Sequence, residues 1–189
     1  ANQVRVINSD DFSTSGFLKA KTPLQEPRGI WIDEEGKIYV ADTGKSRIAV
    51  FSPEGEELFT FGKEGMGNDE FYYPRGVAVD GDGHIWVVDT QHHCIKVFDE
   101  KGNFLFRFGQ GGEGEEDFNQ PRYLFIQGNW VFISDYRNHR IKVYNREGVL
   151  QEIMGEEGRG EGEFSFPEGL WIDKDGKLWI ADAGNNRLQ

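Results

Sequence analysis

The sequence predicts an all-β protein, and three observations support this fold class. Four stretches of similar sequence follow one another along the 189 residues. Glycine is abundant, at 25 residues, as expected for many tight turns. Short apolar runs alternate with clusters of Asp, Glu and Gly, a pattern typical of short strands joined by hairpins. Self-similarity at a fixed step indicates a repeat architecture.

The repeats begin with "PRGIWID" at Pro27, "PRGVAVD" at Pro74, "PRYLFIQ" at Pro121 and "PEGLWID" at Pro167. These prolines are 47, 47 and 46 residues apart. An aspartate keeps the same step in all four units: Asp42, Asp89, Asp135 and Asp182.

Each unit predicts four short strands, which in the first unit cover residues 29–33, 37–42, 47–51 and 56–62. The first two strands of a unit carry apolar residues on both faces, so each sheet must be covered on both sides. Four-stranded sheets that stack face to face around an axis provide this cover. The sequence therefore predicts a β-propeller.

The closure of the propeller is predicted from the two ends of the chain. The last unit stops at "NNRLQ", where its third strand is due, and residues 4–7 and 16–20 supply apolar strands of the missing kind. We therefore expect one domain, residues 1–189, with four blades, one of which takes its third and fourth strands from residues 1–26. Three arrangements satisfy the repeat count: a closed four-bladed monomer, a homodimeric eight-bladed ring, and an open fragment of a longer propeller.

The repeats resemble those of the NHL family. The resemblance rests on the P-x-G start, on the "(V/I)AD" end of the second strand, and on "DYRNHRI" (135–141) and "DAGNNRL" (182–188). It covers residues 27–189 and implies propeller blades of NHL type, although NHL propellers usually have six blades. Related propellers include peptidyl-hydroxyglycine lyases and lactonases that hold zinc or calcium.

The stretch "DTQHHC" (89–94) brings two histidines next to the only cysteine, but it aligns with the turn between the second and third strands of the other units. Cys94 stands where the other units have arginine, so we interpret it as a buried thiol rather than a metal ligand. The acidic turns "DGDG" and "DKDG" (80–83 and 173–176) are interpreted as hairpin turns. We predict no metal and no cofactor.

Units 1, 3 and 4 pair an aspartate with an arginine that is expected to brace the turn: Asp42 with Arg47, Asp135 with Arg140, and Asp182 with Arg187.

The residue after each repeat proline is expected at the mouth of the central channel: Arg28, Arg75, Arg122 and Glu168. Two interpretations remain open for the three arginines. They form salt bridges to neighbouring loops, or they bind an anion or carboxylate, which suits the planar guanidinium.

Around this mouth run three interblade loops, which connect the fourth strand of one unit to the first strand of the next: residues 63–73, 110–120 and 156–166. They carry net charges of −2, −4 and −3, most of the total of −12. We expect an acidic rim formed by Glu64, Asp69, Glu70, Glu113, Glu115, Glu116, Asp117, Glu161 and Glu163. One phenylalanine per loop is expected to plug the space between blades: Phe71, Phe118 and Phe164.

These features predict a non-catalytic scaffold that binds a basic protein or peptide on the acidic loop face. The negative charge argues against nucleic acid as a partner, and no stretch has the ~20 apolar residues of a membrane span. One alternative is a structural, engineered or truncated repeat array without a specific ligand. Another is a metal-dependent lyase or lactonase-like enzyme, which is disfavoured because arginines occupy the axial positions that metal ligands would need.

Overall fold

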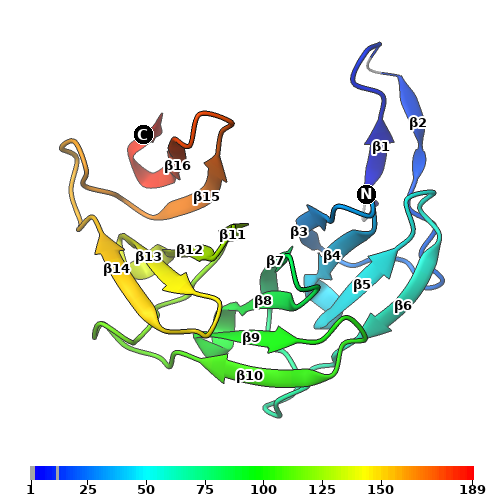
Figure 1. The fold of residues 1–189 in the computed structure, drawn as a ribbon, viewed down its shortest axis with the longest axis horizontal. Coiled ribbons are helices and arrows are strands. Elements are labelled where there is room, and N and C mark those ends of the chain that lie inside the picture. The colour runs from blue at the N-terminus through cyan, green and yellow to red at the C-terminus, as the bar shows by residue number, and fades with distance from the viewer. Residues whose placement is uncertain (1–2, 12) are drawn as a thin grey trace.

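The computed structural model describes residues 3–11 and 13–189, and they form small antiparallel sheets arranged as the blades of a β-propeller (Figure 1). Four of these sheets correspond to the four sequence repeats, so the predicted all-β propeller is confirmed. Blade 1 contains β3 (Pro27–Ile32), β4 (Ile38–Asp42), β5 (Arg47–Phe51) and β6 (Glu57–Phe61). Blade 2 contains β7 (Pro74–Val79), β8 (Ile85–Asp89), β9 (Cys94–Phe98) and β10 (Phe104–Phe108).

Blade 3 contains β11 (Leu124–Gln127), β12 (Trp130–Asp135), β13 (Arg140–Asn145) and β14 (Leu150–Met154). Blade 4 has three strands, β15 (Pro167–Ile172), β16 (Leu178–Asp182) and β17 (Arg187–Leu188). A short 3₁₀ turn joins the second and third strands of each blade: η1 (Thr43–Lys45), η2 (Thr90–His92), η3 (Tyr136–Asn138) and η4 (Ala183–Asn185).

The register of the strands repeats from blade to blade. In three blades the repeat proline pairs with the repeat aspartate: Pro27 lies opposite Asp42, Pro74 opposite Asp89, and Pro167 opposite Asp182. The repeat aspartate in turn faces the first residue of the third strand, as in the pair Asp42 and Arg47. Equivalent residues of the four units therefore occupy equivalent positions around the axis.

The turn between the first and second strands is organised by one aspartate. Asp33 Oδ1 accepts the backbone N–H groups of Glu35 and Lys37, and its Oδ2 accepts the hydroxyl of Tyr39. Asp80 and Asp173 repeat this pattern, with the indole N–H of Trp86 or Trp179 as the last donor. The spacing D-x-x-G-x-x-(Y/W) thus encodes a turn that is hydrogen-bonded to its own second strand.

The core lies between consecutive blades, and the three loop phenylalanines are part of it. Phe71 and Phe118 are fully buried and Phe164 is 3% exposed. Phe71 contacts Phe61 of blade 1 and Phe98 of blade 2, with ring centroids 6.2 and 5.4 Å away. Phe118 lies in the same way between Phe108 of blade 2 and Tyr144 of blade 3. Each phenylalanine therefore fills the space between two neighbouring sheets.

The expected blade built from both ends of the chain is wrong in its strand pairing. In the described residues, β1 (Arg5–Ile7) and β2 (Thr14–Phe17) pair with each other as a separate hairpin, and β17 pairs with β16. The hairpin and blade 4 lie at opposite ends of the series of blades (Figure 1). The reason is apolar contact: Leu18 and Leu24 pack against Val40 and Phe51 of blade 1. Leu18 and Leu24 thus pack on blade 1, and β1 and β2 pair with each other instead of completing blade 4.

The described part of the chain contains no helix that is both long and apolar enough to cross a membrane.

Candidate functional site

One face of the propeller, here called the loop face, carries both the interblade loops and the 3₁₀ turns. A two-sided clamp holds these segments together in every blade. In blade 2, the N–H of Tyr72 donates to Asp89 Oδ1 at 2.8 Å, and the carbonyl of Tyr72 accepts the N–H of Gln91 at 3.1 Å. Gln25, Asn119 and Ser165 are held identically in the other blades by Asp42, Asp135 and Asp182. The four repeat aspartates are fully buried, so the clamp is a structural element of the loop face.

The second oxygen of each clamp aspartate receives a cationic side chain. Arg47 Nε lies 2.7 Å from Asp42 Oδ2, Arg140 Nε lies 2.8 Å from Asp135 Oδ2, and Arg187 Nε lies 2.7 Å from Asp182 Oδ2. A charge-assisted hydrogen bond of this kind stabilises a buried carboxylate. The aspartate and arginine that the sequence pairs in units 1, 3 and 4 are therefore in direct contact.

In blade 2, a lysine and a histidine, instead of an arginine, contact the second oxygen of the clamp aspartate. Lys96 Nζ lies 2.9 Å from Asp89 Oδ2, and His92 Nδ1 lies 2.7 Å from the same oxygen. Cys94 stands in the place of the arginine, but blade 2 does not lack a cation on its clamp aspartate, because the fully buried Lys96, two residues later, replaces the arginine. The sequence did not distinguish this role, because β13 reads "RIKVYN" and carries a lysine at the same position together with the arginine.

Cys94 is 1% exposed, and burial raises the pKa of its thiol to about 12, assisted by the negative charge of Asp89. Such a thiol is protonated at neutral pH and is a poor nucleophile and a poor metal ligand. The two histidines next to Cys94 form hydrogen bonds with other residues: His92 contacts Asp89, and His93 Nδ1 accepts the N–H of Gln120 at 3.1 Å. The two histidines and Cys94 therefore do not converge on a common point.

The acidic residues of the interblade loops fall into two groups. Glu70, Asp117 and Glu163 are half-buried and each accepts the N–H of a loop glycine three residues earlier: Gly67, Gly114 and Gly160. These three carboxylates close a tight turn within their own loop. The other predicted rim residues are exposed: Glu64, Asp69, Glu113, Glu115, Glu116 and Glu161.

Buried lysines of β9 and β13 donate hydrogen bonds to the backbone of two interblade loops, residues 63–73 and 110–120. Lys96 Nζ donates to the carbonyls of Gly67 and Glu70 at 3.0 and 2.5 Å. Lys142 Nζ donates to the carbonyls of Glu115 and Asp117, both at 2.5 Å. Both lysines are fully buried in the sheet beneath. The exposed carboxylates are thus presented on loops whose backbone is held in place.

The loop face also exposes apolar side chains between its acidic groups. Met66 is 79% exposed, Tyr72 is 49% exposed, and Phe166 is 37% exposed. The ring of Phe166 packs at a tilt against those of Tyr136 and His139, with ring centroids 5.0 and 4.5 Å away. The face therefore combines negative charge with isolated aromatic and thioether groups.

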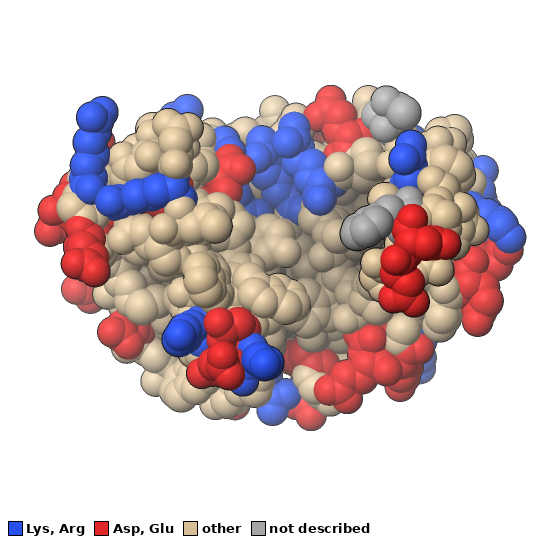
Figure 2. Space-filling model, turned by 90° about the horizontal axis from the view of Figure 1, so that it is seen from above, with Lys and Arg blue, Asp and Glu red and all other residues tan. Residues whose placement is uncertain are grey.

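The four residues predicted at the channel mouth lie at the inner edge of the loop face. Arg122 forms an ion pair with Glu168, and Arg28 Nη2 lies 3.6 Å from Glu26 Oε2. Arg75 has no carboxylate within ion-pairing distance among the described residues. In Figure 2, a compact group of Lys and Arg side chains lies at the upper border of the central hollow, whereas Asp and Glu lie mostly toward the periphery.

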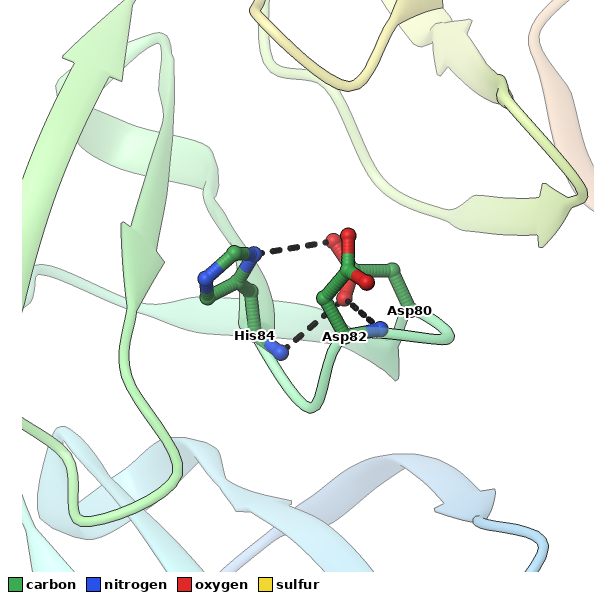
Figure 3. A group of neighbouring side chains, drawn as sticks. All are labelled: Asp80, Asp82 and His84. Atoms are coloured by element: carbon green, nitrogen blue, oxygen red, sulfur yellow. Dashed lines mark hydrogen bonds and ion pairs between the residues drawn. The ribbon is translucent and has the colours of Figure 1, made fainter.

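On the opposite face, Asp80, Asp82 and His84 bring their ligand atoms within 4.8 Å of one another, the only such set in the described residues (Figure 3). Asp80 Oδ1 accepts the N–H groups of Asp82 and His84, and its Oδ2 lies 2.9 Å from Trp86 Nε1 and 3.3 Å from His84 Nδ1. Asp82 in turn contacts Arg146 at 2.7 Å. The lone pairs of Asp80 are thus used within the hairpin turn, as they are in the equivalent turn of Asp33, which has no histidine. The group is the polar frame of a turn.

Comparisons with known proteins agree with the fold. The sequence model of the NHL repeat family matches residues 24–51, 71–98 and 164–189, which belong to units 1, 2 and 4. Unit 3, which has Tyr123 in place of the repeat glycine, is not matched but forms an equivalent blade. No curated protein matches the sequence.

Many solved structures share the arrangement of strands. A streptogramin B lyase structure has 16% sequence identity and a TM-score of 0.78, and the match covers 100% of this chain and 58% of that one. An inactive H270A virginiamycin B lyase from Staphylococcus aureus with quinupristin has 16% identity and a TM-score of 0.73, with 100% and 59% covered. A nidogen/laminin complex has 18% identity and a TM-score of 0.77, with 99% and 69% covered. The chain spans less than two thirds of the length of both lyases, and identities this low indicate a shared fold alone. The chain is therefore a β-propeller in which three of the four sequence units match the NHL repeat.

Proposed function

We propose that the chain is a non-catalytic recognition module whose loop face binds a basic peptide segment of a partner protein. The observation that carries the proposal is the set of exposed carboxylates on three loops whose backbone is clamped to the blades. Charged groups of one sign on a rigid surface attract a partner of opposite charge and set its orientation. Binding to a preorganised surface also avoids much of the entropy cost of ordering the loops.

The apolar groups of the loop face support the same proposal. Met66, Tyr72 and Phe166 are exposed among the carboxylates. Interfaces commonly place aromatic and methionine side chains at the centre and charged groups around them. We therefore expect the preferred peptide to alternate Lys or Arg with large apolar residues. The likeness to a nidogen/laminin complex supports protein recognition as a use of this scaffold.

The proposal is tested with a panel of fluorescent peptides that share one length and one apolar composition but differ in charge. Fluorescence anisotropy measures the affinity for the 189-residue chain at low and at high salt. The triple variant E113Q/E115Q/E116Q removes three exposed carboxylates from one interblade loop. We expect a loss of about tenfold in affinity for the Lys/Arg peptide, because exposed ion pairs contribute roughly 0.2–1 kcal/mol each. The affinity is also expected to fall as salt rises.

The matched control is E34Q/E54Q/E147Q, which removes three exposed carboxylates from hairpin turns on the opposite face. It changes the net charge by the same amount, so it should leave affinity within about twofold. Equal losses in the two triple variants would show that only net charge matters. Equal binding of acidic and basic peptides, or no binding of either, would contradict the proposal.

A further inference from the structure

The arginines Arg28, Arg75 and Arg122 occupy the same position in three consecutive blades, and the structure brings their side chains together. Arg28 and Arg75 both lie over the ring of Tyr73, with guanidinium carbons 5.8 and 5.6 Å from its centroid. Arg122 lies 3.3 Å from the ring centroid of Tyr136. The backbone of Arg122 lies against Gly76, and the charges of Arg28 and Arg75 both act on Arg122, so the three side chains are treated as one group, here called the arginine cluster.

The glycine that follows two of the arginines explains why they converge. A Cβ atom on Gly29 would overlap the carbonyl oxygen of Arg75, and a Cβ atom on Gly76 would lie 3.1 Å from the carbonyl oxygen of Arg122. The inner strands of neighbouring blades therefore approach closely only because no side chain separates them. The P-R-G sequence thus places an arginine and a close interblade contact side by side.

The positive charge of the cluster is only partly compensated. Glu168 pairs with Arg122, and Glu26 lies at the long distance of 3.6 Å from Arg28. The Nε atoms of Arg75 and Arg122 are buried, and neither has a hydrogen-bond partner in the described structure. A buried donor without a partner is costly, typically by about 1–3 kcal/mol, so such donors point to an absent acceptor.

The pKa shifts of two of the arginines also indicate that the cluster lacks negative charge. Burial lowers the pKa of Arg75, and the charge of Arg28 lowers it further. Burial also lowers the pKa of Arg122, and the charge of Arg75 adds to the effect. Both guanidinium groups would be stabilised by an added negative charge nearby.

The rings of Tyr73 and Tyr136 lie against the guanidinium groups, and one terminal N–H group of Arg122 already donates to Glu168. A guanidinium that stacks on an aromatic ring uses its flat face, so its in-plane N–H groups remain available to an oxygen acceptor. Arg122 already donates to the carboxylate of Glu168 in this geometry, and Glu168 stands where a fourth arginine would complete the repeat.

We propose that the arginine cluster is a binding site for a small oxyanion, either the carboxylate groups or the phosphate group of a small molecule. The ligand would lie at the inner edge of the loop face, between Arg28, Arg75 and Arg122. Glu168 would act as an internal carboxylate that shares Arg122 with the ligand. The site is separate from the exposed carboxylates of the interblade loops, and it does not depend on the peptide-binding proposal.

The test is isothermal titration calorimetry of the 189-residue chain with two probes, inorganic phosphate and citrate. We expect saturable binding of at least one probe, and the preferred probe distinguishes a phosphate ligand from a carboxylate ligand. R75Q should weaken binding by about tenfold or more, because a hydrogen bond to a charged group contributes about 1.5–3 kcal/mol. E168Q should tighten binding, because it removes a competing negative charge from Arg122.

The control R107Q removes an exposed arginine from the outer strand β10 and should leave binding within about twofold. R28Q alters an exposed member of the cluster and tests the site even if R75Q does not fold. Absence of saturable binding by both probes would overturn the proposal, as would equal weakening by R75Q and R107Q. The loop variant E113Q/E115Q/E116Q should not weaken phosphate or citrate binding, so the two proposals can fail independently.

Discussion

At the scale of single residues, buried charges organise the loop face. Each clamp aspartate is fully buried yet has a backbone donor on one oxygen and a cation or amide on the other. Breaking one partner of such a pair costs about 3–5 kcal/mol because the other charge is left buried and alone. The clamp therefore explains why the same aspartate recurs in every unit.

Lys142 provides a test at this scale because its charge is buried. Burial lowers the pKa of Lys142 to about 8 from 10.5, against the opposing effect of Asp135. Between these two pH values the unfolded chain binds more protons than the folded chain, so this residue's contribution to stability rises with pH. Below about pH 8 the lysine is charged in both states and the full cost of its burial remains.

We therefore expect the free energy of unfolding of the unsubstituted protein, relative to that of K142M, to increase by about 1–2 kcal/mol between about pH 7 and 9.5. Urea unfolding at the two pH values measures this difference, in which the effects of Cys94 and the tyrosines cancel. The exposed control K101M should show a constant difference. A pH-independent difference for K142M would show that Lys142 titrates normally.

At the scale of elements, the 3₁₀ turns connect neighbouring blades. Thr43 Oγ1 in η1 donates to the carbonyl of Pro74 in blade 2 at 2.6 Å, and Thr90 Oγ1 in η2 donates to the carbonyl of Pro121 before blade 3 at 2.8 Å. Both threonines are buried. In blade 3 the equivalent residue is Tyr136, which instead lies beneath Arg122. The same turn position thus serves blade packing in two units and the arginine cluster in the third.

The variant T90V removes this interblade hydrogen bond while it keeps the shape of the side chain. We expect a loss of about 1–2 kcal/mol in the free energy of unfolding, because the carbonyl of Pro121 is left without its hydroxyl donor. The matched control T60V changes a half-buried threonine of β6 and should cost less than about 0.5 kcal/mol. Chemical denaturation measures both, and equal losses would contradict an interblade role for Thr90.

At the scale of the whole molecule, each blade is stabilised chiefly by its neighbours along the series. All residues of β8 and β9 in blade 2 are buried, whereas β1 is exposed throughout. On blade 4, Trp179 is 45% exposed, although Trp86 in the equivalent position of blade 2 is fully buried. Trp171, which pairs with Trp179, is 60% exposed. The difference arises because blade 2 is packed between two blades of the described structure.

Hydrogen exchange should follow this gradient. We expect the slowest amide exchange in β8, β9, β12 and β13, and the fastest in β1, β2 and β17, because local opening requires less energy where fewer apolar contacts are broken. Exchange followed by mass spectrometry after proteolysis resolves these segments. Protection of β1 and β2 equal to that of β8 and β9 would contradict sequential stabilisation and would indicate that the hairpin is held by further contacts.

The amino-acid sequence by itself determined the repeat, the strands within each unit and the resulting propeller, because these depend on local turn chemistry and on apolar periodicity. It also indicated the aspartate–arginine contacts, the loop phenylalanines and the acidic loops, since equivalent positions in a repeat occupy equivalent places.

Only the tertiary structure decided how these parts meet. It showed that β1 and β2 form a separate hairpin rather than complete blade 4, and that Leu18 and Leu24 pack on an apolar surface of blade 1. It separated the exposed carboxylates from Glu70, Asp117 and Glu163, and it showed that Lys96 replaces the missing arginine of blade 2. It also revealed the unpartnered donors of Arg75 and Arg122. These outcomes depend on contacts between residues far apart in the chain, which no periodicity of the sequence encodes.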